Sequence, residues 1–206
     1  MGRFFEILQS PMYSLLWRLS DRRQIRGFHI GTVGLDGEPQ ALALDKVDAA
    51  LNTIATHDPR RFRRIQRDVP RLLISGTRAL FLGRWHDRLR ICQLAEDWIL
   101  NPSTSSTSVA STIVHEATHA RLSVVPYSEK NSHRVERACH RQEEIFAKRL
   151  ADGAHLVEQA RRAQQLPETF YSMKNRRAQA VAAMEALGWP SWLTRTLRAV
   201  FRLGAA

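Results

Sequence analysis

Apolar residues recur at intervals of three and four along much of the chain, which predicts a mostly helical protein. The predicted helices span residues 45–56, 58–68, 109–125, 131–150, 153–165, 168–187 and 191–201. Asp58-Pro59 is a typical helix start, and Pro167 and Gly188 separate the last three helices. The region from residue 153 to 206 is therefore expected to be a helical C-terminal part.

Shorter segments rich in apolar and β-branched residues predict a small antiparallel sheet packed on this helical body. The predicted strands are residues 28–33, 40–44, 72–74, 79–82 and 89–94. A chain of 206 residues can bury one hydrophobic core, so we expect a single α+β domain over residues 1–206. Within it, residues 1–44 are predicted to form an N-terminal appendage and residues 79–150 the catalytic core.

One motif in the helix predicted at 109–125 carries candidate chemistry. His115-Glu116-Ala117-Thr118-His119 places two imidazoles four residues apart, on one face of the helix. Two such histidines can bind one metal ion and leave Glu116 beside its open coordination position. The flanks are those of a buried helix, with apolar residues on both sides and a Ser/Thr run at 103–108 that offers N-caps. The motif favours metal-assisted hydrolysis.

These residues resemble the signature of the zincin metallopeptidases. The family has a small or β-branched residue three positions before the first histidine and uncharged residues around the pair. Thr112, Ile113, Ala117, Thr118 and Ala120 match, whereas Arg121 departs from the pattern. The resemblance covers residues 89–150 and implies a zincin-like fold, a bound Zn²⁺ and peptide-bond hydrolysis by a zinc-activated water, with Glu116 as general base. It also implies a sheet edge beside the metal helix, for which residues 88–94 are the candidate.

A catalytic zinc generally takes three protein ligands, so the two histidines need a partner. In one zincin branch this is a third histidine, preceded by a glycine, but Leu122 and Val125 occupy those positions. The gluzincin branch takes a glutamate from the next helix. The resemblance points to Glu136 as that ligand, and Glu143, two turns further along the same face, is the runner-up.

Two more residues are candidates for supporting roles. A metal-bound imidazole needs a partner for its other nitrogen, and His140 stands where gluzincins have a polar residue that supports the first histidine. Tyr127 lies between the two helices, where its phenol is a candidate donor to a developing oxyanion. A tyrosine that packs its ring under a turn is an equally good interpretation of that position.

The formal net charge of +11 comes mainly from arginines spread along the chain, and it can attract nucleic acid, anionic lipid or an acidic protein. No helix-turn-helix, zinc-finger or aromatic-interleaved basic motif accompanies it, so nucleic-acid binding is not indicated by a motif. Two alternatives to a peptidase acting on peptides or proteins therefore stay open. One is a DNA-associated basic metalloprotein, and the other is a zinc-stabilised interaction module without catalysis.

The two cysteines, Cys92 and Cys139, are too few for a disulfide framework and predict a reducing compartment. The apolar stretch at residues 4–17 is interrupted by Glu6, Gln9 and Pro11, and no cleavage-site pattern follows it, so it does not predict a signal peptide. No apolar run has the length of a transmembrane helix. These features together predict a cytoplasmic protein.

Overall fold

The computed structural model describes residues 2–76, 81–123, 128, 131–186 and 188–201. Its helices are α1 (Gly2–Leu19), α2 (Gly37–His57), α3 (Pro59–Asp68), α4 (Glu96–Leu100), α5 (Ser106–Leu122), α6 (Ser132–Ala147), α7 (Ala154–Gln164), α8 (Met173–Ala186) and α9 (Ser191–Val200), with short 3₁₀ helices η1 (Asp87–Leu89) and η2 (Glu168–Tyr171). The strands are β1 (Asp21–Ile25), β2 (Phe28–Val33), β3 (Arg71–Ser75), β4 (Gly83–His86) and β5 (Ile91–Ala95). The predicted α+β class is confirmed.

The five strands form one mixed sheet in the order β1-β2-β3-β5-β4. The prediction of an antiparallel sheet is wrong for its centre, because β2, β3 and β5 run parallel to one another. Only the two outer strands are antiparallel to their neighbours, β1 to β2 and β4 to β5. All five residues of β5 are buried, as expected of a parallel strand covered on both faces. The proposed edge at residues 88–94 is therefore also wrong, since β5 lies between β3 and β4, and β4 is the edge strand on that side of the sheet.

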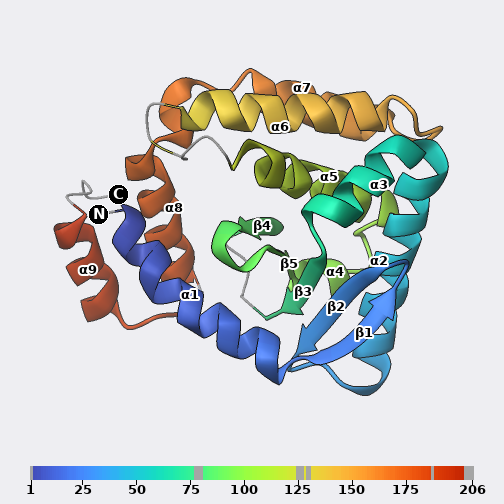
Figure 1. Ribbon diagram of the computed structural model, residues 1–206. Helices are drawn as coiled ribbons and strands as arrows, with labels where there is room; N and C mark the ends of the chain where they lie inside the picture. Colours follow the sequence, from blue (N-terminus) through green and yellow to red (C-terminus); the bar gives the residue numbers. More distant parts are fainter. Residues whose placement is uncertain (1, 77–80, 124–127, 129–130, 187, 202–206) are drawn as a thin grey trace.

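Helices cover both faces of this sheet (Figure 1). On one face, side chains of β2, β3 and β5 form the main core with α2 and α5, through residues such as Ile30, Ile74, Leu94, Leu51 and Ile113. On the other face, Leu73 and Ile91 pack against Tyr13 of α1. The layering holds α5 against the sheet on one side while leaving its opposite side for α6.

Two strand predictions need correction. Residues 40–44 lie inside α2, because Ala43 continues the helical spacing of the buried residues Val47, Ala50 and Ile54. Residues 79–80 lie outside the described part of the chain, and residues 81–82 form an irregular segment before β4. Strand β1 was not predicted, because its residues are almost all exposed and polar and show no alternation. It is joined to β2 by a tight turn in which Arg26 and Gly27 both have positive φ.

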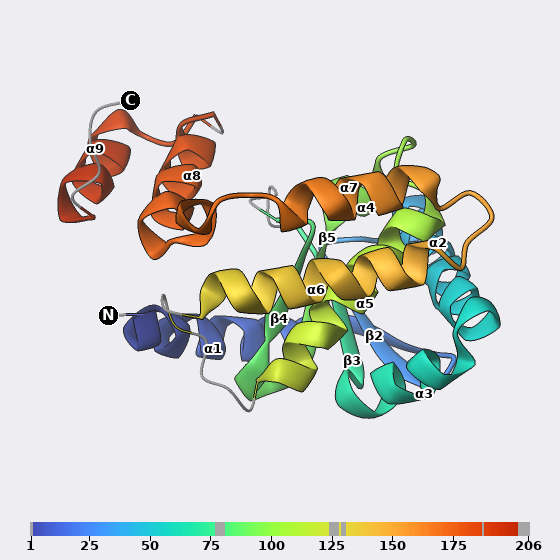
Figure 2. The same ribbon diagram turned by 90° about the horizontal axis from the view of Figure 1, so that it is seen from above.

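The helices predicted at 58–68, 131–150, 153–165 and 191–201 are confirmed with small changes at their ends, and so is the described part of the helix predicted at 109–125. The helix predicted at 168–187 is divided at Ser172 into η2 and α8. Residues 21–33, inside the segment predicted as an N-terminal appendage, contribute β1 and β2 to the sheet. Helices α6 and α7 lie side by side outside α5, and α8 and α9 lie beyond them, away from the sheet (Figure 2). Within the described residues, no helix has the length and apolar character needed to cross a membrane.

Candidate metal centre

Helix α5 carries the HExxH motif. The Ser105 side chain caps its N-terminus by accepting a hydrogen bond from the Ser108 backbone N–H at 3.1 Å, which satisfies an otherwise unpaired donor. Val109, Ile113 and Val114 are buried against the core formed with α2 and the sheet. With this side packed, His115 and His119 project from a different face, toward α6.

Helix α6 supplies the opposite wall. Val135, Cys139 and Phe146 are buried, and they turn the same side of α6 toward α5. Glu136 and Glu143 lie two turns apart on this side, as the helical period requires. The hairpin of α5 and α6 therefore brings together the two histidines and the two glutamates that the sequence identified.

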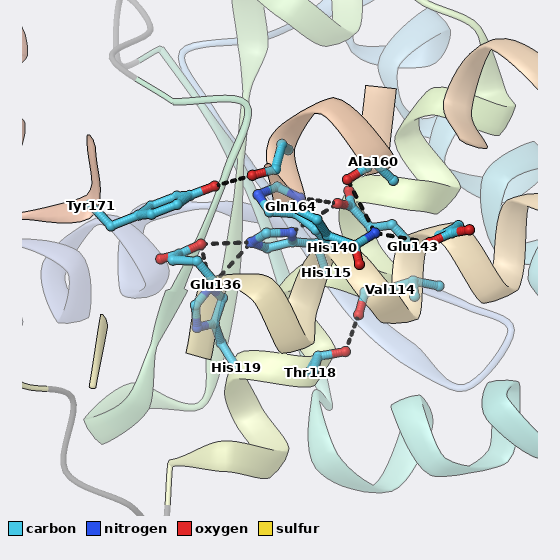
Figure 3. A network of polar contacts seen from close by, with 12 residues as sticks. Val114, His115, Thr118, His119, Glu136, His140, Glu143, Ala160, Gln164 and Tyr171 are labelled. Carbon is cyan, nitrogen blue, oxygen red and sulfur yellow. Dashed lines mark hydrogen bonds and ion pairs between the residues drawn. The ribbon is translucent and has the colours of Figure 1, made fainter. Parts of the chain in front are cut away.

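The three proposed ligands converge on one point (Figure 3). His115 Nε2 and His119 Nε2 are 3.1 Å apart, and Glu136 Oε2 lies 3.4 Å from the first nitrogen and 3.6 Å from the second. Tetrahedral zinc with bonds of about 2.0–2.1 Å separates its ligand atoms by about 3.3 Å. The donor set and its spacing therefore fit a zinc ion.

Glu143 contacts the back of the same site. Its Oε2 lies 3.2 Å from His115 Nδ1, the nitrogen that faces away from Glu136, and 2.5 Å from His140 Nδ1. The partner of the first histidine is thus Glu143, whereas His140 holds Glu143 in place. A carboxylate on the outer nitrogen fixes the ring orientation and tautomer of a ligating imidazole.

The electrostatics of the cluster match this arrangement. Burial opposes ionisation of both glutamates, but hydrogen bonds from His115 and His119 outweigh it and hold the pKa of Glu136 well below its usual range. The charge and hydrogen bond of His115 similarly lower the pKa of Glu143 to about 2. Burial disfavours the charged form of His115, yet Glu143 and Glu136 raise its pKa well above the usual value, so a metal that binds His115 must displace this proton. Both carboxylates are accordingly ionised at neutral pH, as metal ligation and its support require.

Two other donor sets occur in the cluster. The Cys139 sulfur lies within 4.8 Å of a nitrogen of His115 and of His119. Burial and then the charge of Glu136 raise the pKa of this thiol far above its usual value, so the thiolate needed for ligation is disfavoured beside an ionised carboxylate. The second set is His115, His140 and Glu143, but the 2.5 Å contact within it is a hydrogen-bond distance, too short for two ligands of one ion.

Glu116 lies on the side of α5 that faces β4 and is only 6% exposed. The strand comes so close there that a Cβ on Gly83 would lie 2.6 Å from Thr112 Cγ2 and 3.2 Å from Glu116 Oε1. A side chain at this position would force Thr112, Glu116 or the strand itself to shift. The carboxylate thus sits between the donor cluster and the edge strand.

Two tyrosines are relevant to the surroundings of the site. Tyr127, which the sequence analysis selected as a candidate oxyanion donor, lies outside the described residues. Tyr171 of η2 lies near the cluster, with its ring centre 6.4 Å from that of His140 and its hydroxyl donating to the Ala163 carbonyl. No pattern in the sequence indicates Tyr171, whereas an isolated glycine in a strand, such as Gly83, is typical of a close backbone approach.

Comparison of the chain with protein-family models, curated proteins and solved structures finds no match. The functional argument consequently rests on the residues and geometry of the site itself.

Proposed function

We propose that this protein is a zinc-dependent metallopeptidase in which His115, His119 and Glu136 hold the metal. The observation that carries the proposal is the spacing of their three donor atoms, between 3.1 and 3.6 Å, on two packed helices. The ionised Glu143 behind His115 is the second support, because structural and catalytic zinc sites both need oriented ligands.

A zinc ion held by His115, His119 and Glu136 would polarise a substrate carbonyl and activate a water molecule near neutral pH. Three protein ligands would leave room for that water, as a catalytic site needs. The role of Glu116 is to accept a proton from the attacking water and to deliver it to the leaving amine. Its burial keeps bulk water from competing for that proton.

The edge strand suggests how a substrate lies. In the described part of the chain, β4 pairs with β5 on one side and with no strand on the other. An extended peptide can add to such an edge by main-chain hydrogen bonds, with little dependence on its sequence. Because β4 approaches α5 at Gly83, a peptide paired there passes close to Glu116 and the metal ligands. This supports a peptide or an unfolded protein as the substrate.

Cys92 and Cys139 are both free and buried, which supports a cytoplasmic location.

The test combines zinc content with hydrolysis of an unfolded protein such as casein. Glu116→Gln should keep its zinc and lose activity by about 10²- to 10⁴-fold, the usual contribution of a general base. Glu144→Gln is the matched control, since Glu144 lies on α6 but pairs with Lys148 and Arg161 outside the site, and it should behave as wild type. His115→Ala should lose both metal and activity.

Full activity in Glu116→Gln would refute the peptidase assignment. A wild-type protein that binds zinc tightly, is stabilised by it and hydrolyses nothing would instead be a zinc-stabilised interaction module.

A further inference from the structure

Six exposed arginines lie on three helices that contact one another, α3, α5 and α6. We call this group the arginine face, and it consists of Arg60, Arg64, Arg121, Arg134, Arg137 and Arg141. The first two come from α3, the third from the end of α5, and the last three from successive turns of α6. It plays no part in the proposed hydrolysis.

Specific contacts bring these helices together. Arg61 of α3 donates to the Gln142 side chain of α6 at 3.2 Å, and Arg149 lies 3.5 Å from Asp58 at the start of α3. A shallow pocket between α3 and α5 is lined by Arg64 and Arg121 together with Thr118. The pocket lies on a different side of α5 from Glu116 and β4, so Arg64 and Arg121 lie apart from Glu116. On α6, the three arginines are exposed whereas Glu136 is buried.

The two carboxylates at the ends of α3 are already paired with basic residues. Asp58 is buried and pairs with Arg61 and Arg149, and Asp68 pairs with Arg67. None of the six arginines has an ion pair with another residue in the described part of the chain. The result is a surface with a net positive field across three helices.

The residue type points to phosphate. Of the 31 basic residues in the chain, 27 are arginine and 4 are lysine. The planar guanidinium binds a phosphate through two parallel hydrogen bonds and is more weakly hydrated than an ammonium group. Arg134 and Arg141 are about 10 Å apart along the α6 axis, a length over which duplex DNA carries about six phosphates. A line of arginines is therefore a better match for the closely spaced phosphates of DNA than for the scattered carboxylates on the surface of a protein partner.

The surroundings of the face argue against a membrane surface. Binding at a lipid interface normally buries large apolar side chains along with the basic ones. The large exposed apolar residues of α1 and of the segment at α9, including Met12, Leu15, Leu19, Trp189 and Trp192, lie elsewhere. On the exposed side of α6 only Ile145 is of this kind, at 36% exposure.

We propose that the arginine face binds the phosphodiester backbone of nucleic acid without reading its sequence. This inference does not depend on the metallopeptidase assignment, and removing the zinc should leave it unchanged.

The experiment measures anisotropy of a fluorescent duplex DNA of arbitrary sequence at several salt concentrations, with the full chain. The test variant is Arg64→Gln/Arg121→Gln/Arg137→Gln, which takes one arginine from each helix. The control, Arg18→Gln/Arg22→Gln/Arg195→Gln, removes the same charge from exposed sites on α1, β1 and α9. Each lost phosphate contact lowers the slope of log K against log salt by about 0.9, so the test variant should lose nearly 3 from the slope and bind roughly 500-fold more weakly near 0.1 M salt.

The control should retain the wild-type slope. A triple Arg→Lys variant of the same face should also retain most of the slope, and it covers the case in which the Gln variant fails to fold. Equal losses in the test and control variants would overturn the proposal, as would no DNA binding at low salt. So would a face-dependent association with phosphatidylserine vesicles or polyglutamate in place of DNA.

Discussion

The assignment of different roles to Glu136 and Glu143 makes a quantitative prediction about zinc affinity. Both side chains are ionised, nearly buried and in contact with His115, yet they contact opposite nitrogens of its ring. Glu136 also contacts His119, whereas Glu143 also contacts His140. Alanine at position 136 therefore removes a ligand, and alanine at position 143 removes only the group that orients one.

The size of the second effect follows from its role. Loss of an outer partner of a metal-bound histidine typically costs 10- to 100-fold in metal affinity, or about 1.4–2.8 kcal/mol. We expect Glu143→Ala to fall in this range, because His115 keeps its position on the packed helix α5. Glu136→Ala should lose more than about 100-fold, since the remaining two nitrogens cannot complete a three-ligand site.

The assay is competition for zinc against a chromogenic chelator at neutral pH. Glu144→Ala is the control, because that glutamate is the next residue on α6 but pairs with Lys148 and Arg161. Its zinc affinity should equal that of the wild type. A larger loss in Glu143→Ala than in Glu136→Ala would refute the assignment and make Glu143 the ligand.

Three further predictions concern the scaffold. Burial lowers the pKa of His86 to about 4 despite its hydrogen bond with Gln93, so the unfolded chain binds the proton more tightly. Stability from this group is present above pH 6.5 and is lost toward pH 4, by roughly 3 kcal/mol, and urea unfolding of His86→Gln should not show this part of the acid loss. Gly83→Val should push β4 away from Glu116, the proposed general base, and lower hydrolysis by roughly 100-fold with normal zinc content; unchanged activity would contradict the close approach. Asp58→Ala should destabilise the fold by about 3–5 kcal/mol in urea titrations, because it leaves the buried Arg61 without its carboxylate partner; a loss below about 1 kcal/mol would show that Gln142 and water satisfy Arg61 without Asp58.

The elements that the sequence predicted well are those with a strong local signal. Helices α5 and α6 have long apolar faces, and α3 begins at Asp58-Pro59, where the Asp58 side chain accepts from the Arg61 backbone N–H. The elements that it missed depend on neighbours. β1 is polar and exists because it pairs with β2 around a tight turn, and the direction of β5 depends on which strands flank it.

By itself the sequence identified the two histidines, the glutamate between them, and two candidate glutamates on the next helix, because helical spacing alone decides which side chains share a face. It left Glu136 and Glu143 as alternatives, since both lie on the side of α6 that meets α5. Only the tertiary structure separated them, by placing Glu136 against the inner nitrogens of both histidines and Glu143 against the outer nitrogen of one. Only the tertiary structure likewise showed that β4 is an edge strand and that the helices carrying the arginine face contact one another, because contacts between segments distant in the chain are set by the packing of whole elements.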